Sequence, residues 1–281
     1  MKQLPMNDSD FKVIRSQNQY FVDKSYFIEQ VNADWQRVIL ITRPRRFGKT
    51  TNLSMLRYFY DNCQGNMAEV AANNTLFAGL KIADKEVFTQ QQGQHPVISM
   101  TLKDQSALNW DEAYAKLQSL ISDFYIQHDY LVSNESLKPH EKNIFQAIID
   151  KKASEVELQE SLAKLINYLA RYFDSLPVVL GDEYDTPLQS AYLNGGCEGE
   201  YYKKMANFLR GFLGPALKDN PKLHKAVFTG IVRVAKASLF TGLNNFECYT
   251  VLAPNYADCF GFTETEVEQL VTTYSPMYNI A

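Results

Sequence analysis

Apolar runs that alternate with helical patterns predict an α/β fold with a mostly parallel sheet. Residues 37–42 ("RVILIT") are a continuous β-branched and aliphatic run, residues 97–102 have the composition of a strand core, and residues 178–180 are a short aliphatic run. Such runs are typical of strands covered on both faces. Between them, residues 110–128 and 155–174 carry apolar side chains at helical spacing. Strands alternating with helices in this way indicate a parallel sheet flanked by helices.

The other elements fit the same class. Before the first strand, Phe21–Asp23 is a short extended piece, and Asp23 or Ser25 is a candidate cap for a helix over 25–32. Residues 226–229 look like a further strand. Two more helices are predicted at 141–150 and 200–217. A last one begins after Thr263, where Glu266 completes a capping box.

These elements divide the 281 residues into an N-terminal segment (1–36), a core with a helical insertion (37–262) and the start of a C-terminal helical segment (263–281). Only "PMYNIA" follows the last predicted helix, which indicates a truncated chain or a short natural protein.

Composition and charge narrow the function classes. The net charge of −4 gives the whole chain no general attraction for nucleic acid, although residues 43–46 hold three arginines. No apolar run reaches the roughly 18 residues that a membrane helix needs, and the N-terminus has no signal-peptide core. The four cysteines lack metal-ligand spacing. We therefore expect reduced thiols in a cytoplasmic protein, without a structural zinc.

The junction "TRPRRFGKTTN" resembles a phosphate-binding loop between a buried strand and a helix. Gly48-Lys49-Thr50 matches the end of GxxxxGK[ST], while Arg43 occupies the place of the first glycine and Pro44 can fix the turn instead. In that motif lysine reaches the phosphates and the hydroxyl binds Mg²⁺. The alternative is a basic surface turn. The candidate nucleotide-binding residues are Arg45, Arg46, Phe47, Gly48, Lys49, Thr50 and Thr51.

An acidic strand end supports the nucleotide interpretation. In "PVVLGDEYD", Asp182 is expected to complete the Mg²⁺ site with Thr50, and Glu183 to activate water. The alternative is a strand followed by a polar turn containing Asp185. Gly181 either loosens the strand or makes room for a neighbour.

The strand at 226–229 supplies further candidates. Thr229 lies at its end, where it is placed to sense the γ-phosphate. Arg233 follows four residues later and is a candidate for neutralising transition-state charge in catalysis, with Lys49 and Glu183. A surface arginine in a loop is the alternative.

Several blocks together resemble a known family. They are "FVDKSYFIEQV", "RPRRFGKTTNLSMLRYFY", "VVLGDEYDTPL", "FTGIVRVAKASLFTGLNNF" and "GFTETEV", spread over about residues 5–270. The chain resembles the AAA-ATPase-like domain of a widespread group of bacterial proteins. This resemblance implies a P-loop NTPase fold of the AAA or STAND-like type with ATP and Mg²⁺ as ligands. It also implies a C-terminal nuclease-like domain of the PD-(D/E)xK type in many members, and base contacts near Phe21, Val22 and Asp23.

We therefore expect an ATP-binding domain that hydrolyses ATP slowly with Mg²⁺ and acts as a switch for a protein partner or an absent C-terminal domain. Slow turnover is expected because no second arginine-finger motif is evident. One alternative is a nucleotide switch without meaningful hydrolysis. Another is a nucleic-acid-associated defence ATPase, which the acidic net charge disfavours.

Overall fold

The computed structural model describes residues 2–5, 8–232 and 246–278. Its centre is a five-stranded sheet in the order β2-β3-β4-β1-β5, and every neighbouring pair runs parallel. The strands are β1 (Val38–Thr42), β2 (Val97–Thr101), β3 (Val178–Asp182), β4 (Lys225–Gly230) and β5 (Phe246–Tyr249). The predicted α/β class with a parallel sheet is confirmed.

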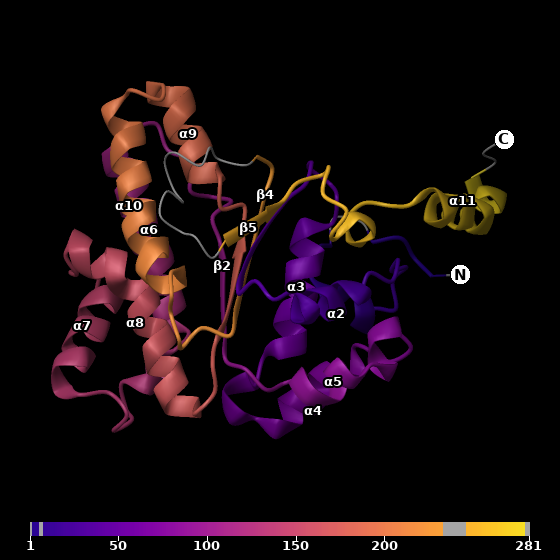
Figure 1. Cartoon of the computed structure of the whole chain (residues 1–281), viewed down its shortest axis with the longest axis horizontal. Helices are drawn as coiled ribbons and strands as arrows, with labels where there is room; N and C mark the ends of the chain where they lie inside the picture. The colour runs from indigo at the N-terminus through magenta and orange to yellow at the C-terminus, as the bar shows by residue number, and fades with distance from the viewer. Residues whose placement is uncertain (1, 6–7, 233–245, 279–281) are drawn as a thin grey trace.

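One face of the sheet is covered by a compact layer of helices, drawn on the left of Figure 1. These helices share one apolar cluster with alternate strand residues such as Leu40, Val179 and Phe228. They are α6 (Trp110–Ile126), α7 (Pro139–Ile149), α8 (Glu155–Phe173), α9 (Thr186–Gly195) and α10 (Glu200–Leu217).

The opposite face carries the N-terminal half of the chain and its C-terminal end. Ile39, Ile41 and Leu180 point into this second cluster, together with Phe11 and Phe27. Its helices are α1 (Phe11–Ser16), α2 (Tyr26–Ala33), α3 (Lys49–Tyr60), α4 (Met67–Thr75) and α5 (Glu86–Gln91). Because successive strand residues pack into opposite clusters, the central strands carry apolar side chains on both faces of the sheet.

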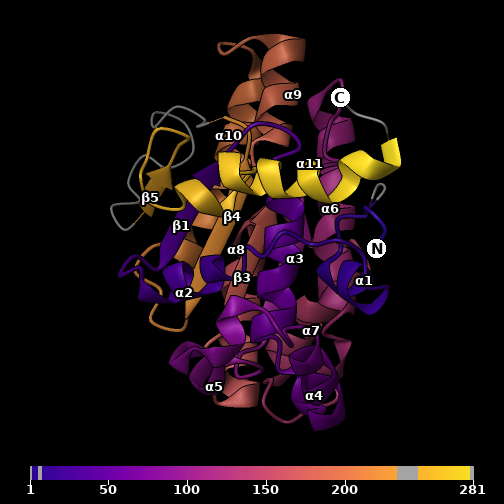
Figure 2. The ribbon, with the colours of Figure 1, turned by 90° about the vertical axis from the view of Figure 1, so that its right-hand side faces the viewer.

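The last helix, α11 (Glu264–Tyr278), lies beside the N-terminal segment and crosses the molecule in front of α3 (Figures 1 and 2). Short 3₁₀ helices occupy Cys63–Gly65, Lys81–Asp84, Asp129–Leu131 and Ala257–Cys259. No helix among the residues described is both long and apolar enough to cross a membrane.

The predicted strands and helices agree with the structure to within about two residues, and the Thr263–Glu266 capping box is present. One boundary was wrong. We expected Pro276 to follow the last helix, but α11 continues to Tyr278. Pro276 therefore lies inside the last turn of α11 and not after it. The prediction also missed β5, because "FECY" is too short and too polar to stand out.

Candidate functional site

The carboxyl ends of β1, β3 and β4 meet at one edge of the sheet. The Arg43–Gly48 loop follows β1 and leads directly into α3. Gly48 is left-handed, with φ 76°, which glycine adopts without steric cost, and Arg46 is also left-handed, with φ 68°. The loop therefore turns sharply before Lys49 opens the helix. This edge is where open parallel sheets place their ligands.

Lys49 folds back beneath this loop. Its Nζ donates to the carbonyl oxygens of Arg43 (3.0 Å) and Pro44 (2.8 Å). Burial lowers the pKa of Lys49, and the nearby carboxylates of Asp182 and Glu183 oppose that shift. The ammonium thus lies between the loop carbonyls and the acidic strand end.

Arg43 has a structural position in the loop. It is 3% exposed, and its guanidinium donates to the carbonyls of Thr42 (2.9 Å), Tyr249 (2.9 Å) and Tyr256 (3.2 Å). The guanidinium also lies over the ring of Phe260, 5.4 Å from its centroid. Arg43 therefore ties the loop to β5 and to the segment that follows β5. Sequence reasoning identified Arg43 only as a replacement for glycine.

Asp182 joins three elements through its carboxylate. Thr50 Oγ1 of α3 donates to Oδ2 at 2.6 Å, and Thr229 Oγ1 of β4 donates to Oδ1 at 2.5 Å. The backbone N–H of Glu183 adds a third bond at 3.0 Å. The structure therefore brings the predicted Thr50, Asp182 and Thr229 into direct contact.

This arrangement has the donor types that Mg²⁺ prefers. Thr50 and Asp182 offer a hydroxyl and a carboxylate, while no group of three metal-binding His, Cys, Asp or Glu side chains occurs in the described part of the chain. Mg²⁺ usually takes one or two protein oxygens and completes its shell with water and substrate phosphates. The residues present fit such a shared site.

The rest of the DEYD block shapes the end of β4. Asp185 is buried, and its Oδ2 accepts the N–H groups of Ile231 (3.0 Å) and Val232 (2.9 Å). Tyr184 donates its hydroxyl to the carbonyl of Val232 at 2.7 Å. This block therefore fixes the turn just before Arg233. Arg233 itself lies outside the described residues, so its catalytic role stays a prediction.

Glu183 has φ 51°, in the left-handed region, and is half-buried. Its Oε2 accepts the hydroxyl of Thr186 at 3.3 Å, so the start of α9 helps to orient the carboxylate.

Packing against a neighbouring strand explains why position 181 is a glycine. It pairs with Phe228 of β4, and a Cβ at position 181 would lie 2.3 Å from the Phe228 ring. Of the two alternatives left by the sequence, the structure favours the one in which glycine makes room for a neighbour. The acidic strand end stays in register with β4.

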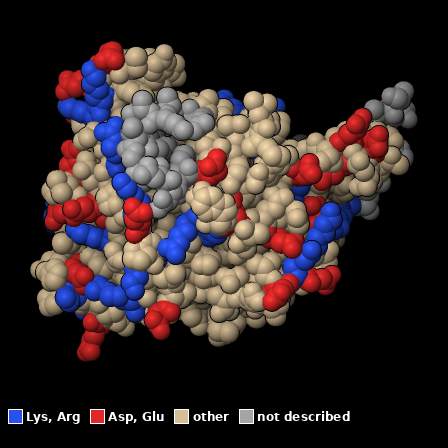
Figure 3. Space-filling view, viewed as in Figure 1, with Lys and Arg blue, Asp and Glu red and all other residues tan. Residues whose placement is uncertain are grey.

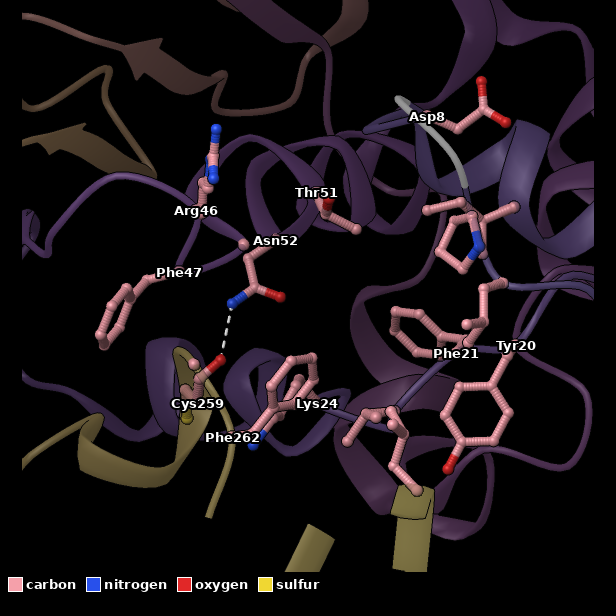
Figure 4. A pocket seen from close by; sticks show the side chains of 17 residues that line it. Asp8, Tyr20, Phe21, Lys24, Arg46, Phe47, Thr51, Asn52, Cys259 and Phe262 are labelled. Atoms are coloured by element: carbon pink, nitrogen blue, oxygen red, sulfur yellow. Dashed lines mark hydrogen bonds between the residues drawn. The ribbon is translucent and has the colours of Figure 1, made fainter. Parts of the chain in front are cut away.

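A cavity of about 380 Å³ opens beside the Arg43–Gly48 loop. In Figure 4, Tyr20 and Phe21 lie on one side of it, with Phe47, Asn52 and Cys259 on the other. Its remaining lining residues are Leu4, Pro5, Asp8, Ile14, Val22, Lys24, Arg46, Gly48, Thr51, Gly261, Phe262 and Leu270. Rings and aliphatic side chains form much of the wall, which suits a flat, apolar group.

Of the three residues predicted to contact the base, the structure places two at the cavity and one away from it. Phe21 and Val22 line the cavity, whereas Asp23 is not among its lining residues. The Asp23 carboxylate instead accepts the N–H groups of Ser25 (2.9 Å) and Lys81 (2.8 Å). Arg45 is exposed on the loop.

Sequence reasoning missed the contribution of the C-terminal segment. Asn52 donates to the carbonyl of Cys259 at 2.8 Å, drawn as a dashed line in Figure 4. The N–H of Gly261 donates to the carbonyl of Phe47 at 3.0 Å. The Thr263–Glu266 capping box signals the helix in sequence, but no local signal shows where that helix packs.

Comparison with known proteins identifies the family. Residues 5–240 match the family model described as "Predicted AAA-ATPase". The chain belongs to this family. No solved structure matches this AAA-ATPase family member.

A curated relative of this AAA-ATPase family member is the uncharacterized protein in the vnfD 5′ region of Azotobacter chroococcum mcd 1. The two are 25% identical over 276 residues, which cover 98% of this chain and 46% of the relative. The chain thus spans about half the length of that relative. The family match ends at residue 240, so the part of the cavity wall formed by Cys259, Gly261, Phe262 and Leu270 lies beyond it.

Proposed function

We propose that this AAA-ATPase family member binds ATP with Mg²⁺ at the Arg43–Gly48 loop and hydrolyses it slowly. The observation that carries the proposal is the contact between Thr50 and Asp182 (2.6 Å) beside the buried Lys49. A P-loop NTPase site needs these three groups together at the start of a helix. On binding, Lys49 exchanges its two loop carbonyls for phosphate oxygens.

The adjoining cavity is where the base binds. Its volume of about 380 Å³ lies within the range of small-ligand sites. Phe21 and Val22 supply apolar contacts, while Gly48 and Thr51 connect the cavity to the phosphate end of the site. Base and triphosphate therefore occupy adjoining parts of one surface.

The proposed reaction is attack of water on the γ-phosphorus. The bond from that phosphorus to the β–γ bridging oxygen breaks, which gives ADP and phosphate, while Glu183 accepts the proton of the water. A bound Mg²⁺, held by Thr50 and Asp182, supplies charge neutralisation on the phosphates. Arg45, Arg46 and the predicted Arg233 are candidates for neutralising the remaining charge.

ATP occupancy would then control a protein partner or a C-terminal nuclease-like domain. The support is that Phe47 of the loop and Asn52 in the first turn of α3 both form hydrogen bonds with the C-terminal segment. The relative's greater length leaves room for such a domain in that protein.

A titration with a fluorescent ATP analogue tests the binding proposal. The wild-type protein should bind it in the presence of Mg²⁺, and Lys49→Ala should weaken binding about 100-fold, because charge-assisted bonds to phosphate are lost. Lys164→Ala, on the surface of α8, is the matched control and should bind normally. Equal binding by Lys49→Ala and wild type would contradict the site, and a parallel titration with a GTP analogue measures base preference.

A nucleotide switch without meaningful hydrolysis is the second candidate. One observation favours it: Thr186 already bonds the Glu183 carboxylate, which restrains the proposed general base. Glu183→Gln separates the two functions. It should abolish phosphate release and keep ATP binding if the protein hydrolyses ATP, and it should change neither if the protein is only a switch.

The nucleic-acid alternative gains no comparable support. On the face shown in Figure 3, basic and acidic side chains are interspersed, and acidic ones gather near α11. The contacts of Arg43 are internal. A surface that binds nucleic acid usually shows a continuous basic patch.

A further inference from the structure

Lys24 connects the N-terminal wall of the cavity to the C-terminal segment. Its buried Nζ donates to the carbonyl of Asp258 (2.7 Å) and to both carboxylate oxygens of Glu266 (2.8 and 2.6 Å). The ammonium has three donors, and these partners can use all of them. Although Lys24 lines the cavity, its charge is directed to α11 and away from the space left for a ligand.

Glu266 is held in place at the start of α11. Its Oε2 accepts the N–H of Thr263 at 2.8 Å, and the hydroxyl of Thr263 accepts the N–H of Glu266 at 3.4 Å. Burial alone would raise the pKa of Glu266, but bonds from Lys24 and Thr263 keep it below its usual value. The carboxylate thus serves both as a helix cap and as the partner of a buried charge.

A second tether fastens the far end of the same helix. Tyr274 donates its hydroxyl to the carbonyl of Lys2 at 2.6 Å, and its ring meets that of Tyr20 edge-on at 5.3 Å. Between the two tethers, Leu270 lines the cavity. Figure 2 shows α11 lying across this side of the molecule, next to the N-terminal segment.

Leu270 of the tethered helix and Phe262, just before that helix, form a wall of the cavity that belongs to neither the sheet nor α3. Phe262 and Leu270 belong to this wall, yet Phe262 is 62% exposed and Leu270 is only half-buried. Apolar packing is thus modest here. Of the two polar attachments of α11 described above, the Lys24–Glu266 pair is stronger than the Tyr274–Lys2 hydrogen bond, because charge-assisted hydrogen bonds are stronger than neutral ones.

We propose that the Lys24–Glu266 ion pair is a latch that holds α11 against the base cavity and sets how fast bound nucleotide leaves. The inference rests on the proposed function, since it assigns regulation to the same site. Breaking the pair leaves one charge buried without its partner, which favours the displaced position of α11. Loss of such a buried pair acts mainly on dissociation rates.

Stopped-flow displacement of a fluorescent ATP analogue by excess ATP tests the latch. Glu266→Gln keeps a capping oxygen but removes the charge, and Lys24→Met keeps the length of the side chain without the ammonium. Each should raise the dissociation rate about tenfold, with a smaller change in the association rate. In the double variant the two effects should not add, because they break one interaction. Glu160→Gln, which breaks the surface pair Lys164–Glu160 on α8, is the control and should leave the rate unchanged.

Hydrogen exchange provides a readout that does not need nucleotide. Exchange in α11 should rise in Glu266→Gln and Lys24→Met while exchange in α8 and α10 stays the same, which also shows that the variants are folded. Normal nucleotide binding with dissociation rates within twofold of wild type would overturn the latch alone. Absence of binding by the wild-type protein would overturn the proposed function as well.

Discussion

Two buried lysines at opposite ends of the sheet make similar local contacts in different surroundings. Lys49 donates to the carbonyls of Arg43 and Pro44, and Lys225 donates to those of Asp34 and Gln36. Burial lowers the pKa of both. Lys49, however, faces three acids, Asp182, Glu183 and Asp185, and one base, Arg45. Lys225 faces one acid, Asp34, and one base, Arg37.

The difference separates a candidate site from a structural anchor. Lys49 follows a loop with left-handed residues and lies near the oxygen atoms of Thr50 and Asp182. Lys225 lies within β4 and ties the start of that strand to the segment before β1. The two lysines are not distinguished by their own hydrogen bonds, which are alike. They are distinguished by the charged side chains around them and by the backbone conformation of the neighbouring loop.

The largest expected effect is the contrast between two substitutions in ATP binding. Lys49→Met should weaken ATP binding about 100-fold, because charge-assisted bonds to phosphate are lost, and should also lower the free energy of unfolding, because its bonds to the Arg43 and Pro44 carbonyls are buried or partly buried. Lys225→Met should lower the free energy of unfolding by about 1–3 kcal/mol, because two buried carbonyls lose their donor, while binding by the folded protein stays normal. Calorimetric titration and chemical denaturation measure the two. Equal effects of both variants on ATP binding would contradict the distinction between Lys49 as a site residue and Lys225 as a structural anchor.

The next effect concerns the acidic side of the comparison. Asp182→Asn removes the charge that faces Lys49 but keeps an oxygen near Thr50 and Thr229. We expect the Mg²⁺-dependent part of ATP affinity to disappear, a loss of about tenfold, while binding without Mg²⁺ changes little. Titrations with Mg²⁺ and with EDTA measure this. Asp150→Asn, on the surface at the end of α7, serves as control.

Gly181 tests how the acidic strand end keeps its position. Gly181→Val should destabilise the fold by about 1–3 kcal/mol, because the new side chain overlaps the Phe228 ring. Phe228→Ala should recover part of that loss in the double variant, since it empties the occupied space. Chemical denaturation of the two single variants and the double variant gives the coupling free energy between positions 181 and 228. Purely additive losses would mean that the two positions do not compete for space.

The smallest effect is a pH dependence at the end of the sheet that holds Lys225. His95 and His224 stack with ring centroids 3.9 Å apart; burial lowers the pKa of both, that of His224 to about 3. Their neutral forms therefore stabilise the fold above the unfolded pKa of about 6.5, and this contribution is lost as the pH falls toward the lowered values. Because His224 is only partly buried, we expect the free energy of unfolding to fall by about 1 kcal/mol between pH 7 and pH 5.

Denaturation of His224→Asn and wild type at both pH values isolates this contribution. The variant should lose less stability than the wild type on acidification. Nucleotide affinity should not depend on the protonation of either histidine. A pH dependence that is the same in both proteins would assign it to the carboxylates.

Sequence reasoning recovered the elements that carry local signals. Continuous apolar runs predicted β1 to β4, helical spacing predicted α6 and α10, and the capping box predicted the start of α11. The phosphate-loop motif selected Thr50. Asp182 and Thr229 were selected because they lie at strand ends, which meet at one edge of a parallel sheet. Sequence reasoning failed for β5, which is short and lies at the edge of the sheet.

The sequence by itself thus determined the α/β class, the strand ends and the residue types of the candidate site. Tertiary structure decided that Arg43 is an internal tie to Tyr256, that Gly181 yields space to Phe228, and that Lys24 holds Glu266. Periodicity and capping report contacts within a few residues, where geometry follows from the backbone itself. The bonds from Arg43 to Tyr256 and from Lys24 to Glu266 join residues more than two hundred positions apart, and only the folded chain brings them together.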